Sequence, residues 1–220
     1  LFCNPYPSNE QIHAYYNSEM KSFENEFFRD SFEERINIFL PRIELIQKYM
    51  TSGKLLDVGS AIGIFIEALH RSKTSFDLAC CDMSKEACIE LRERYPNLKV
   101  LNNDYLDLDI ETQFEVITLW DTIEHIVDLK GLLQKTYCLL KNDGVFIFST
   151  PNTASFEWIC AREKHVQILP PGHVNLMNWK CIDILLKNNS FHVIDAFTLN
   201  ASLDLSYVKN LIEKNEVAKG

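Results

Sequence analysis

The sequence lacks an excess of positive charge and lacks any long apolar run, and each absence excludes a class of partner. Its 220 residues carry a formal net charge of −9, so there is no basic field to attract a nucleic-acid backbone. No apolar stretch approaches the roughly 20 residues that a membrane-spanning helix needs, and no signal-peptide pattern opens the chain. We therefore predict neither a nucleic-acid partner nor a membrane span.

Paired cysteine motifs are missing as well. The seven cysteines include no C-x-x-C pair, and Cys80 and Cys81 lie inside an apolar run. Scattered thiols in odd number in an acidic chain are typical of a reducing compartment, so we predict a cytoplasmic protein without disulfides. The first residue is Leu1 rather than methionine, which is compatible with a piece of a longer protein.

The turn at residues 55–65 matches neither the glycine pattern of a dinucleotide-binding turn nor that of a P-loop. The stretch LLDVGSAIGIF, from Leu55 to Phe65, passes from an apolar run through small residues into a second apolar pattern. A dinucleotide turn starting at Gly59 requires glycine at positions 61 and 64, where the chain has Ala61 and Ile64, and no Gly-Lys-Ser/Thr follows as in a P-loop. The turn therefore argues against NAD and against a phosphate cradle.

What the sequence does contain is an alternation of short apolar runs and helical patterns from residue 54 onward. Strands with little two-residue alternation, separated by helices, indicate an α/β fold with a doubly wound, mostly parallel Rossmann-like sheet, whose ligands lie beyond the carboxyl ends of the strands. The predicted strands are 54–58, 76–81, 99–101, 114–119, 145–149 and 191–197, and the predicted helices are 62–71, 84–95, 129–140 and 179–187.

Three further regions frame this pattern. Residues 1–50 are aromatic and helical, with Pro41 expected to kink or divide a helix, and we interpret them as a lid segment. The core covers 51–199 and includes an irregular stretch at 150–178, which is long enough for a substrate loop. Residues 200–220 form an ambiguous tail that is most simply helical.

The spacing Asp57-x-Gly59-x-Ala61-x-Gly63 resembles the first motif of class I S-adenosylmethionine-dependent methyltransferases of the type 11, 12 and 23 groups, with alanine in place of the middle glycine. The resemblance implies that the cofactor is S-adenosylmethionine and that its methionine part lies against the backbone of Gly59, Ser60, Ala61 and Gly63. Asp57 would accept a hydrogen bond from the cofactor's ammonium group, unless it only caps or braces the turn.

Acidic side chains at the next two strand ends extend the match. Asp82 lies 23 positions after Gly59 (82 − 59), where a carboxylate accepts hydrogen bonds from both ribose hydroxyls; a helix N-cap is the alternative. Met83 would pack on the adenine or fill the core. The resemblance implies that Asp104 accepts from the adenine amino group and that Tyr105 completes the base edge; a plain Asx turn is the alternative.

The run after the fourth predicted strand, from Trp120 to Asp128, resembles the x-x-x-x-E-H-V-x-D segment of methyltransferases that include those acting on ubiquinone precursors. Trp120 would border the sulfonium. Histidine is the side chain best suited to remove a hydroxyl proton near neutral pH, so His125 is a candidate general base. The resemblance alternatively implies that Asp121, Glu124 and His125 bind Mg²⁺; a third reading is that residues 124 and 125 only brace a helix start.

His173 is the second candidate for a residue that contacts the methyl acceptor. Its segment, GHVNLMNW, resembles the G/E-H-x-x-x-[FWLM]-[ST] stretch that precedes the late helix of these enzymes, so His173 would bind or deprotonate the acceptor unless it only fixes the turn. The opening NPYPS, followed by Tyr15 and Tyr16, resembles the lead-in of a group that modifies glycans and small metabolites. Tyr16 would then close over the cofactor, whereas the plainer reading is that this helix covers the sheet.

The sequence thus predicts a methyltransferase that uses S-adenosylmethionine and acts on a small-molecule or glycan acceptor, most simply at oxygen. Two alternatives stay open, a nucleotide-cofactor oxidoreductase of the NAD type and a non-catalytic relative that binds cofactor. No motif specifies the oligomeric state. The seventh, antiparallel strand of the family sheet is not evident in 199–220, which leaves truncation, divergence or supply from elsewhere.

Overall fold

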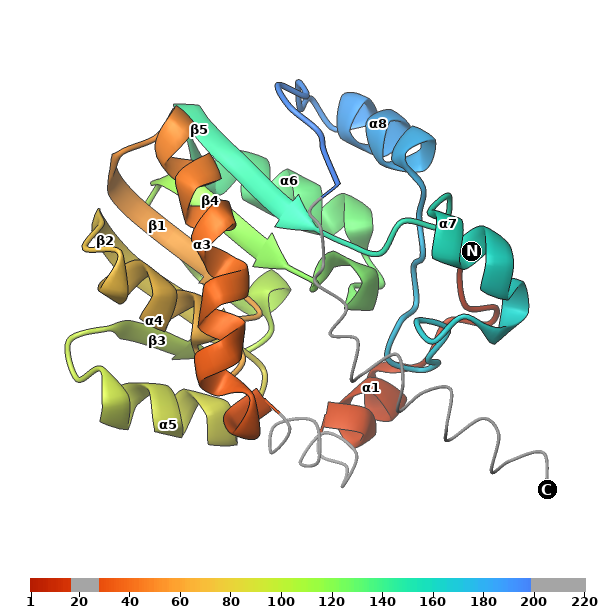
Figure 1. Cartoon of the computed structure of the whole chain (residues 1–220), viewed down its shortest axis with the longest axis horizontal. Coiled ribbons are helices and arrows are strands. Elements are labelled where there is room, and N and C mark those ends of the chain that lie inside the picture. Colours follow the sequence, from red (N-terminus) through yellow and green to blue (C-terminus); the bar gives the residue numbers. More distant parts are fainter. Residues whose placement is uncertain (17–27, 199–220) are drawn as a thin grey trace.

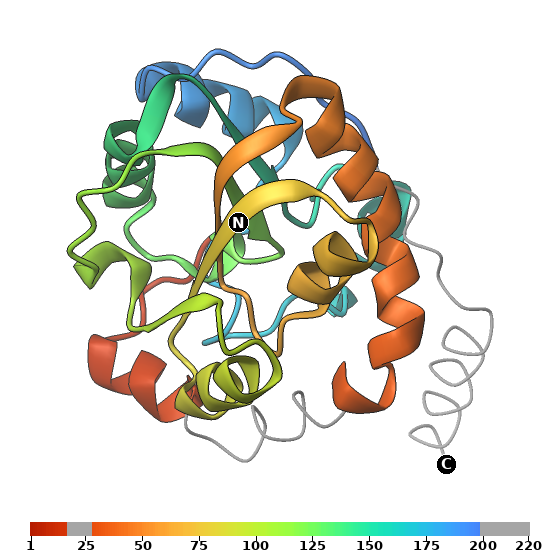
Figure 2. The ribbon, with the colours of Figure 1, turned by 90° about the vertical axis from the view of Figure 1, so that its left-hand side faces the viewer.

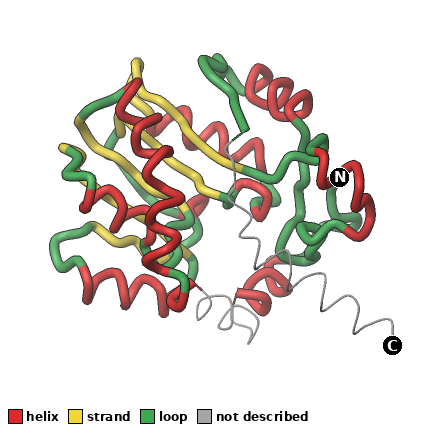
Figure 3. Tube along the Cα trace, in the orientation of Figure 1, coloured by secondary structure: helices red, strands yellow, loops and turns green. Residues whose placement is uncertain are grey.

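The computed structural model describes residues 1–16 and 28–198, and its centre is a five-stranded sheet (Figures 1 and 3). The strand order is β3-β2-β1-β4-β5, and every neighbouring pair is parallel. This confirms the predicted doubly wound α/β class. The strands are β1 (Ser52–Val58), β2 (Ser75–Asp82), β3 (Lys99–Asn102), β4 (Phe114–Trp120) and β5 (Leu140–Ser149).

Helices cover both faces of the sheet, as Figure 2 shows in a view along its edge. Helices α3 and α4 pack on one face together with part of α5, and α6 and α8 pack on the other. The helices are α1 (Asn9–Tyr16), α3 (Phe32–Tyr49), α4 (Ile64–Arg71), α5 (Lys85–Arg94), α6 (Leu129–Leu139), α7 (Phe156–Ala161) and α8 (Trp179–Asn188).

The continuous apolar strands follow from this two-sided cover. In β1, Leu55 is fully buried against α3 and α4, whereas its neighbour Leu56 is fully buried in the cluster that includes α6 and α8. Each leucine side chain removed from water contributes about 1.5–3 kcal/mol. Successive residues of a central strand therefore both have to be apolar, and two-residue alternation disappears.

Helix α3 runs without interruption through Pro41, so of the two predicted effects of this proline, a kink or a division, the division is wrong. A proline removes one backbone hydrogen bond from a helix. The buried side chains of Ile36, Ile43 and Ile46 lie on both sides of the proline and hold the helix against the sheet. Packing thus outweighs the lost bond.

The predicted strand at 191–197 is also wrong, because the structure contains no strand in its described residues after β5. The aromatic ring of Phe191 instead packs on the rings of Phe146 and Tyr137, and Val193 packs on the same cluster. Phe191 and Val193 are thus packed without a hydrogen-bonded ladder, whereas Ile194 and Phe197 of the same segment are exposed. The predicted tail helix lies outside the described residues.

Within the described part of the chain, no helix combines the length and the apolar character that crossing a membrane requires.

The carboxyl ends of β4 and β5 point toward two segments that are far apart in sequence, residues 1–16 and 150–178 (Figure 1). The amino group of Leu1 donates to the carbonyl oxygen of Leu176 at 2.8 Å, and Phe2 forms an antiparallel bridge with Asn175. The first residues of the chain are therefore part of the same end of the molecule as the predicted substrate loop. Whether residues 1–16 act as a lid stays a prediction.

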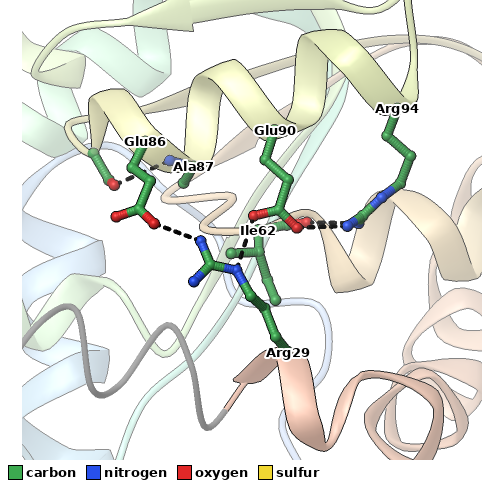
Figure 4. Close-up of polar contacts among 7 residues, drawn as sticks. Arg29, Ile62, Glu86, Ala87, Glu90 and Arg94 are labelled. Carbon is green, nitrogen blue, oxygen red and sulfur yellow. Dashed lines mark hydrogen bonds and ion pairs between the residues drawn. The ribbon is translucent and has the colours of Figure 1, made fainter.

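Charged side chains connect α5 to the turn after β1 (Figure 4). Arg94 donates to the carbonyl oxygen of Ile62 at 3.1 Å and to Glu90 at 2.6 Å, while Arg29 bonds Glu86 at 2.7 Å and Glu90 at 3.1 Å. Exposed ion pairs of this kind contribute little individually. The bond to Ile62 is the one that acts directly on the turn.

The turn after β1 requires glycine at position 59. Gly59 has φ of 75°, in the left-handed region, and a Cβ atom there would lie 2.7 Å from Cγ2 of Thr122. Thr122 belongs to the segment after β4, so the two loops touch at a point where only a hydrogen atom fits.

We predict that Gly59→Ala lowers the free energy of unfolding by about 2 kcal/mol or more. A left-handed φ costs alanine about 1–2 kcal/mol, and its methyl group also meets Thr122, which adds overpacking strain. Urea denaturation followed by circular dichroism measures the change. In a Thr122→Ala background the same substitution should cost less, because the contacting atoms are gone. An equal cost in both backgrounds would contradict the proposed contact.

Candidate functional site

The glycine turn closes onto the end of the neighbouring strand β2. The amides of Gly59 and Ser60 donate to the carbonyl oxygen of Cys81 at 2.9 and 3.2 Å, and the amide of Ala61 donates to the Asp82 carboxylate at 2.8 Å. Two predicted cofactor elements, the turn and the acid at the end of β2, therefore form one hydrogen-bonded unit.

Within the turn, the backbone rather than the side chains is available to a ligand. The Ser60 side chain is buried and its hydroxyl donates to the carbonyl oxygen of Cys81 at 3.4 Å. Ala61 has φ of 45° and Gly63 has φ of 82°. Ala61 thus adopts the left-handed conformation that glycine adopts at lower cost, and its bond to Asp82 holds it there.

Asp82 also organises the start of α5. Its second carboxylate oxygen accepts from the amide of Ser84 at 2.7 Å, while the Ser84 hydroxyl accepts from the amide of Ala87 and caps the helix. The cap therefore does not require Asp82. An ionised carboxylate has about four acceptor positions, so Asp82 can hold the backbone and still accept from a bound hydroxyl group.

The end of β3 lies beside Asp82. The side chain of Asn102 donates to the carbonyl oxygens of Asp82 and Met83 at 3.0 and 3.1 Å. Asp104 accepts from the amide of Leu106 at 2.9 Å, the Asx-turn bond that the sequence left as an alternative. Met83 and Asp104 are both half-buried.

Tyr105 differs from its neighbour because its side chain is part of the core. Its hydroxyl lies 3.2 Å from the Thr136 hydroxyl, and burial raises the pKa of Tyr105 well above its ordinary value. Only its backbone N–H remains as a contact for a base edge.

Asp57 is a buried carboxyl group near the end of β1, 2 % exposed, and Thr118 donates to it at 2.7 Å. Burial raises the pKa of Asp57 to about 8; the Thr118 hydrogen bond opposes this rise and the charge of Asp82 adds to it. Near neutral pH the group is therefore largely protonated, and a cation bound beside it would favour the ionised form.

Arg42 of α3 and Trp120 at the end of β4 form a feature that the sequence reading missed. They are 8 % and 9 % exposed, and the guanidinium lies 5.4 Å from the indole ring. Among the described residues, Nε of Arg42 and Nε1 of Trp120 are the buried side-chain atoms without a hydrogen-bond partner. Burial lowers the pKa of Arg42, and Asp121 partly offsets this.

A buried hydrogen-bond donor without a partner destabilises the folded protein. This pair is therefore suited to donate hydrogen bonds to an acceptor atom of a bound ligand. The helical pattern of α3 contained a signal for it, because an arginine at position 42 falls between buried isoleucines at 36, 43 and 46. A charged residue on the apolar side of a helix is uncommon unless it has a partner.

At the other end of the site, Glu124 is 1 % exposed and accepts from the Thr150 hydroxyl at 3.0 Å. Burial raises the pKa of Glu124 to about 8, and the nearby charge of Asp121 adds to the rise. Its carbonyl oxygen accepts from the amides of Val174 and Asn175 at 2.9 and 3.0 Å. These bonds join the loop after β4 to the predicted substrate loop.

The two candidate histidines are brought together by that junction. The rings of His125 and His173 lie edge to face with centroids 4.7 Å apart. Nδ1 of His125 lies 2.9 Å from the carbonyl oxygen of Gly172, and Nδ1 of His173 lies 2.7 Å from that of Gln167. Because a carbonyl oxygen only accepts, both Nδ1 atoms carry the proton in these bonds.

Asp121 does not join this group, and the predicted set of Asp121, Glu124 and His125 does not fit a metal ion. The Asp121 carboxylate accepts from the Ser149 hydroxyl at 2.8 Å and faces Arg42 at 4.0 Å. In the part of the chain that the structure describes, the group whose ligand atoms lie within 4.8 Å of one another is Glu124, His125 and His173. His173 thus replaces Asp121.

A cavity of about 520 Å³ lies between the first residues of the chain and Pro170 and Pro171, which directly precede the Gly172–His173 pair; neither candidate histidine lines it. Its lining is mostly proline and tyrosine, with Cys3 donating from its thiol to the carbonyl oxygen of His173 at 3.6 Å. The lining residues are Cys3, Pro5, Tyr6, Pro7, Gln11, Ala14, Tyr15, Pro170 and Pro171. The predicted cofactor lid at Tyr16 lies at the end of α1, and its side chain lies outside the described part.

Comparison with known proteins gives consistent results. A family model described as "Methyltransferase domain" matches residues 28–196. The chain is 29% identical over 188 residues to a protein of Actinobacillus pleuropneumoniae named ubiquinone biosynthesis O-methyltransferase, covering 72% of this chain and 78% of that protein. It is 29% identical over 125 residues to the carboxy-S-adenosyl-L-methionine synthase of Nautilia profundicola, covering 54% of this chain and 52% of that one.

Among solved structures, a SAM-dependent methyltransferase from Thermotoga maritima aligns with a TM-score of 0.61 and 18% identity, covering 78% of this chain and 79% of that chain. At this identity the likeness concerns the fold, and it agrees with the parallel sheet and its helical layers.

The buried Asp57 predicts a pH dependence of stability. The folded state holds this proton up to about pH 8, whereas an unfolded aspartate releases it near pH 4. The folded state therefore binds more protons between these values, and stability falls as pH rises through that window. The slope for one group is at most about 1.4 kcal/mol per pH unit.

Asp57→Asn cannot ionise and still accepts from Thr118, so its free energy of unfolding should fall less between pH 5 and 8 than that of the natural chain. Urea titrations at several pH values measure the slope. Asp77→Asn removes an exposed carboxylate near the start of the neighbouring strand β2 and serves as control, with an unchanged slope. Identical slopes for all three proteins would refute the buried, protonated Asp57.

Proposed function

The chain belongs to the methyltransferase domain family and is an S-adenosylmethionine-dependent enzyme, and we propose that it transfers the methyl group to a hydroxyl oxygen of a small acceptor. The observation that carries the proposal is the row of Asp57, Asp82 and Asp104 at the carboxyl ends of three adjacent strands, β1, β2 and β3. The three carboxyl groups follow the same order as the polar groups of S-adenosylmethionine, namely the ammonium group, the ribose hydroxyls and the adenine.

In this proposal the cofactor lies across the carboxyl edge of the sheet. Asp82 accepts from the ribose hydroxyls, Asp104 and the backbone of Tyr105 meet the adenine, and Met83 packs on its face. The bare backbone of the glycine turn takes the methionine part. Asp57 receives the ammonium group, whose charge favours the ionised form of this carboxyl group.

Arg42 and Trp120 complete the cofactor assignment. The methionine part of S-adenosylmethionine ends in a carboxylate, which accepts hydrogen bonds and carries negative charge. One nitrogen of the Arg42 guanidinium donates to the carbonyl oxygen of Ile38 at 3.0 Å. Its Nε and the indole N–H of Trp120 lack acceptors among the described residues and are suited to that carboxylate. Trp120, at the end of β4, would then also border the sulfonium side of the cofactor.

For the acceptor, the support comes from the pair of His125 and His173 and from the proline- and tyrosine-lined cavity, whose lining residue Cys3 donates to the carbonyl oxygen of His173. The acceptor oxygen attacks the methyl carbon, the carbon–sulfur bond breaks with its electron pair moving to sulfur, and the hydroxyl proton passes to a histidine. The relative named as an O-methyltransferase favours oxygen as the atom methylated. The apolar lining favours a small aromatic hydroxyl compound, with a sugar as the alternative.

We predict that Asp82→Ala and Arg42→Gln each weaken the binding of S-adenosylhomocysteine at least about 10-fold, because each removes a charge-assisted hydrogen bond of about 1.5–3 kcal/mol. Isothermal titration calorimetry measures the affinity. Asp77→Ala, on the same strand as Asp82 but exposed and near its start, should bind like the natural chain. Binding of NAD with no binding of S-adenosylhomocysteine would overturn the proposal in favour of the oxidoreductase.

We further predict that His125→Ala and His173→Ala lower kcat about 10²- to 10⁴-fold while the affinity for S-adenosylhomocysteine stays unchanged. Transfer of a radiolabelled methyl group to 3,4-dihydroxybenzoate, simple sugars or carboxylic acids supplies the assay. His165→Ala is the matched control, since His165 stacks on Trp158 at 4.1 Å in the same loop and stands outside the histidine pair.

Undiminished turnover in both histidine variants would remove them from the chemistry. Cofactor binding without transfer to any of these acceptors would instead favour the non-catalytic alternative.

A further inference from the structure

The junction between the loop after β4 and the substrate loop places one carboxylate and two imidazoles around a common point. Glu124 and His125 come from the short 3₁₀ turn Ile123–His125, and His173 comes from a segment 48 positions later (173 − 125). One ligand atom from each of the three lies within 4.8 Å of the others. Around a tetrahedral zinc ion, ligand atoms at about 2.0–2.1 Å stand about 3.3 Å apart, so a small inward rotation of the side chains closes the set.

Both imidazoles are already oriented in the way that metal ligands usually are. A ligating histidine generally donates its other ring N–H to a carbonyl or carboxylate, which fixes the tautomer. Here the carbonyl oxygens of Gly172 and Gln167 receive Nδ1–H of His125 and His173 at 2.9 and 2.7 Å. This tautomer presents Nε2 as the ligand atom on each ring.

The carboxylate of Glu124 also lacks the partner that a buried acid normally has. It is 1 % exposed, and among the described residues no lysine or arginine forms an ion pair with it. The Thr150 hydroxyl donates to it at 3.0 Å and orients the group. A carboxyl group buried without a counter-ion is stable only in its neutral form, and a metal ion bound beside it would compensate the charge of the ionised form.

From these three observations we propose that Glu124, His125 and His173 bind a divalent transition-metal ion of the zinc type. Two imidazoles with one carboxylate suit zinc, whereas Mg²⁺ prefers oxygen ligands throughout. The proposal departs from the Mg²⁺ set expected from sequence both in the ion and in the third ligand, since Asp121 faces Ser149 and Arg42. Three protein ligands leave a fourth position open, as in catalytic zinc sites.

This inference deepens the proposed function, because the open position lies where an acceptor hydroxyl would be bound. A bound cation would lower the pKa of a coordinated hydroxyl group, so that its proton is released to solvent and the two histidines hold the metal instead of accepting the proton. The binding of metal is nevertheless a property of the free protein. It can be measured without cofactor or acceptor, so the two proposals can fail separately.

The test uses the full chain, treated with chelator and then titrated with Co²⁺ alone under reducing conditions, followed by competition with Zn²⁺. We expect one Co²⁺ per chain with visible d–d absorption that Zn²⁺ abolishes. His173→Ala, His173→Gln and Glu124→Gln should each weaken binding at least about 100-fold, since even loss of an outer partner of a ligand costs 10- to 100-fold. Circular dichroism of the metal-free variants confirms that they are folded.

Three matched controls separate this site from other metal-binding side chains. Asp121→Asn, His165→Ala and Cys3→Ser should bind Co²⁺ like the natural chain; Cys3 is included because its thiol lies next to His173. The proposal is overturned if the natural chain binds no stoichiometric Co²⁺ or if folded His173 variants bind it unchanged. It is equally overturned if Asp121→Asn loses binding and His173→Ala does not, or if a control variant loses as much as His173→Ala. Methyl transfer that persists in a metal-free chain would leave the proposed function standing.

Discussion

The proposed cofactor site depends on the hydrogen bonds that the Asp82 carboxylate accepts from the backbone. The carboxylate receives the amide of Ala61 from the glycine turn and the amide of Ser84 from the start of α5. A turn built from positive-φ residues is strained wherever a side chain is present, and this carboxylate holds the alanine in place. The same group then stands at the end of β2 where a ribose is proposed to bind. Support of the backbone and recognition of the ligand are thus combined in one side chain.

Much of this half of the site could be predicted from the sequence, because each part is local. A strand, a small-residue turn and a helix are contiguous, and the acids at 57, 82 and 104 each directly follow an apolar run. Parallel order alone then aligns their positions at one edge. The side-chain directions were less predictable: Tyr105 belongs to the core, since its hydroxyl reaches Thr136.

The remaining features depend on contacts between distant segments, and local patterns do not contain them. Backbone hydrogen bonds between two loops join Glu124 and His125 to the segment of His173. Asp121, only three positions from Glu124, has a left-handed φ of 49°, and its carboxylate contacts Ser149 and Arg42 instead. The partnerless donors of Arg42 and Trp120 become visible only once α3 is packed on β4. The apolar pattern at 191–197 was compatible with a strand, but Phe191 packs on Phe146 without one, and Ile194 and Phe197 are exposed.

The pairing of the first residues with the substrate loop has a consequence for the order of folding. The bond between Leu1 and Leu176 spans 175 positions of sequence, whereas the glycine turn and Asp82 are joined across 21 positions. Closing the longer loop carries the larger entropic cost, which must be met before its contacts form. We expect the sheet and its cofactor edge to assemble first, and the acceptor end to join afterwards and to be the first part to open in the folded protein.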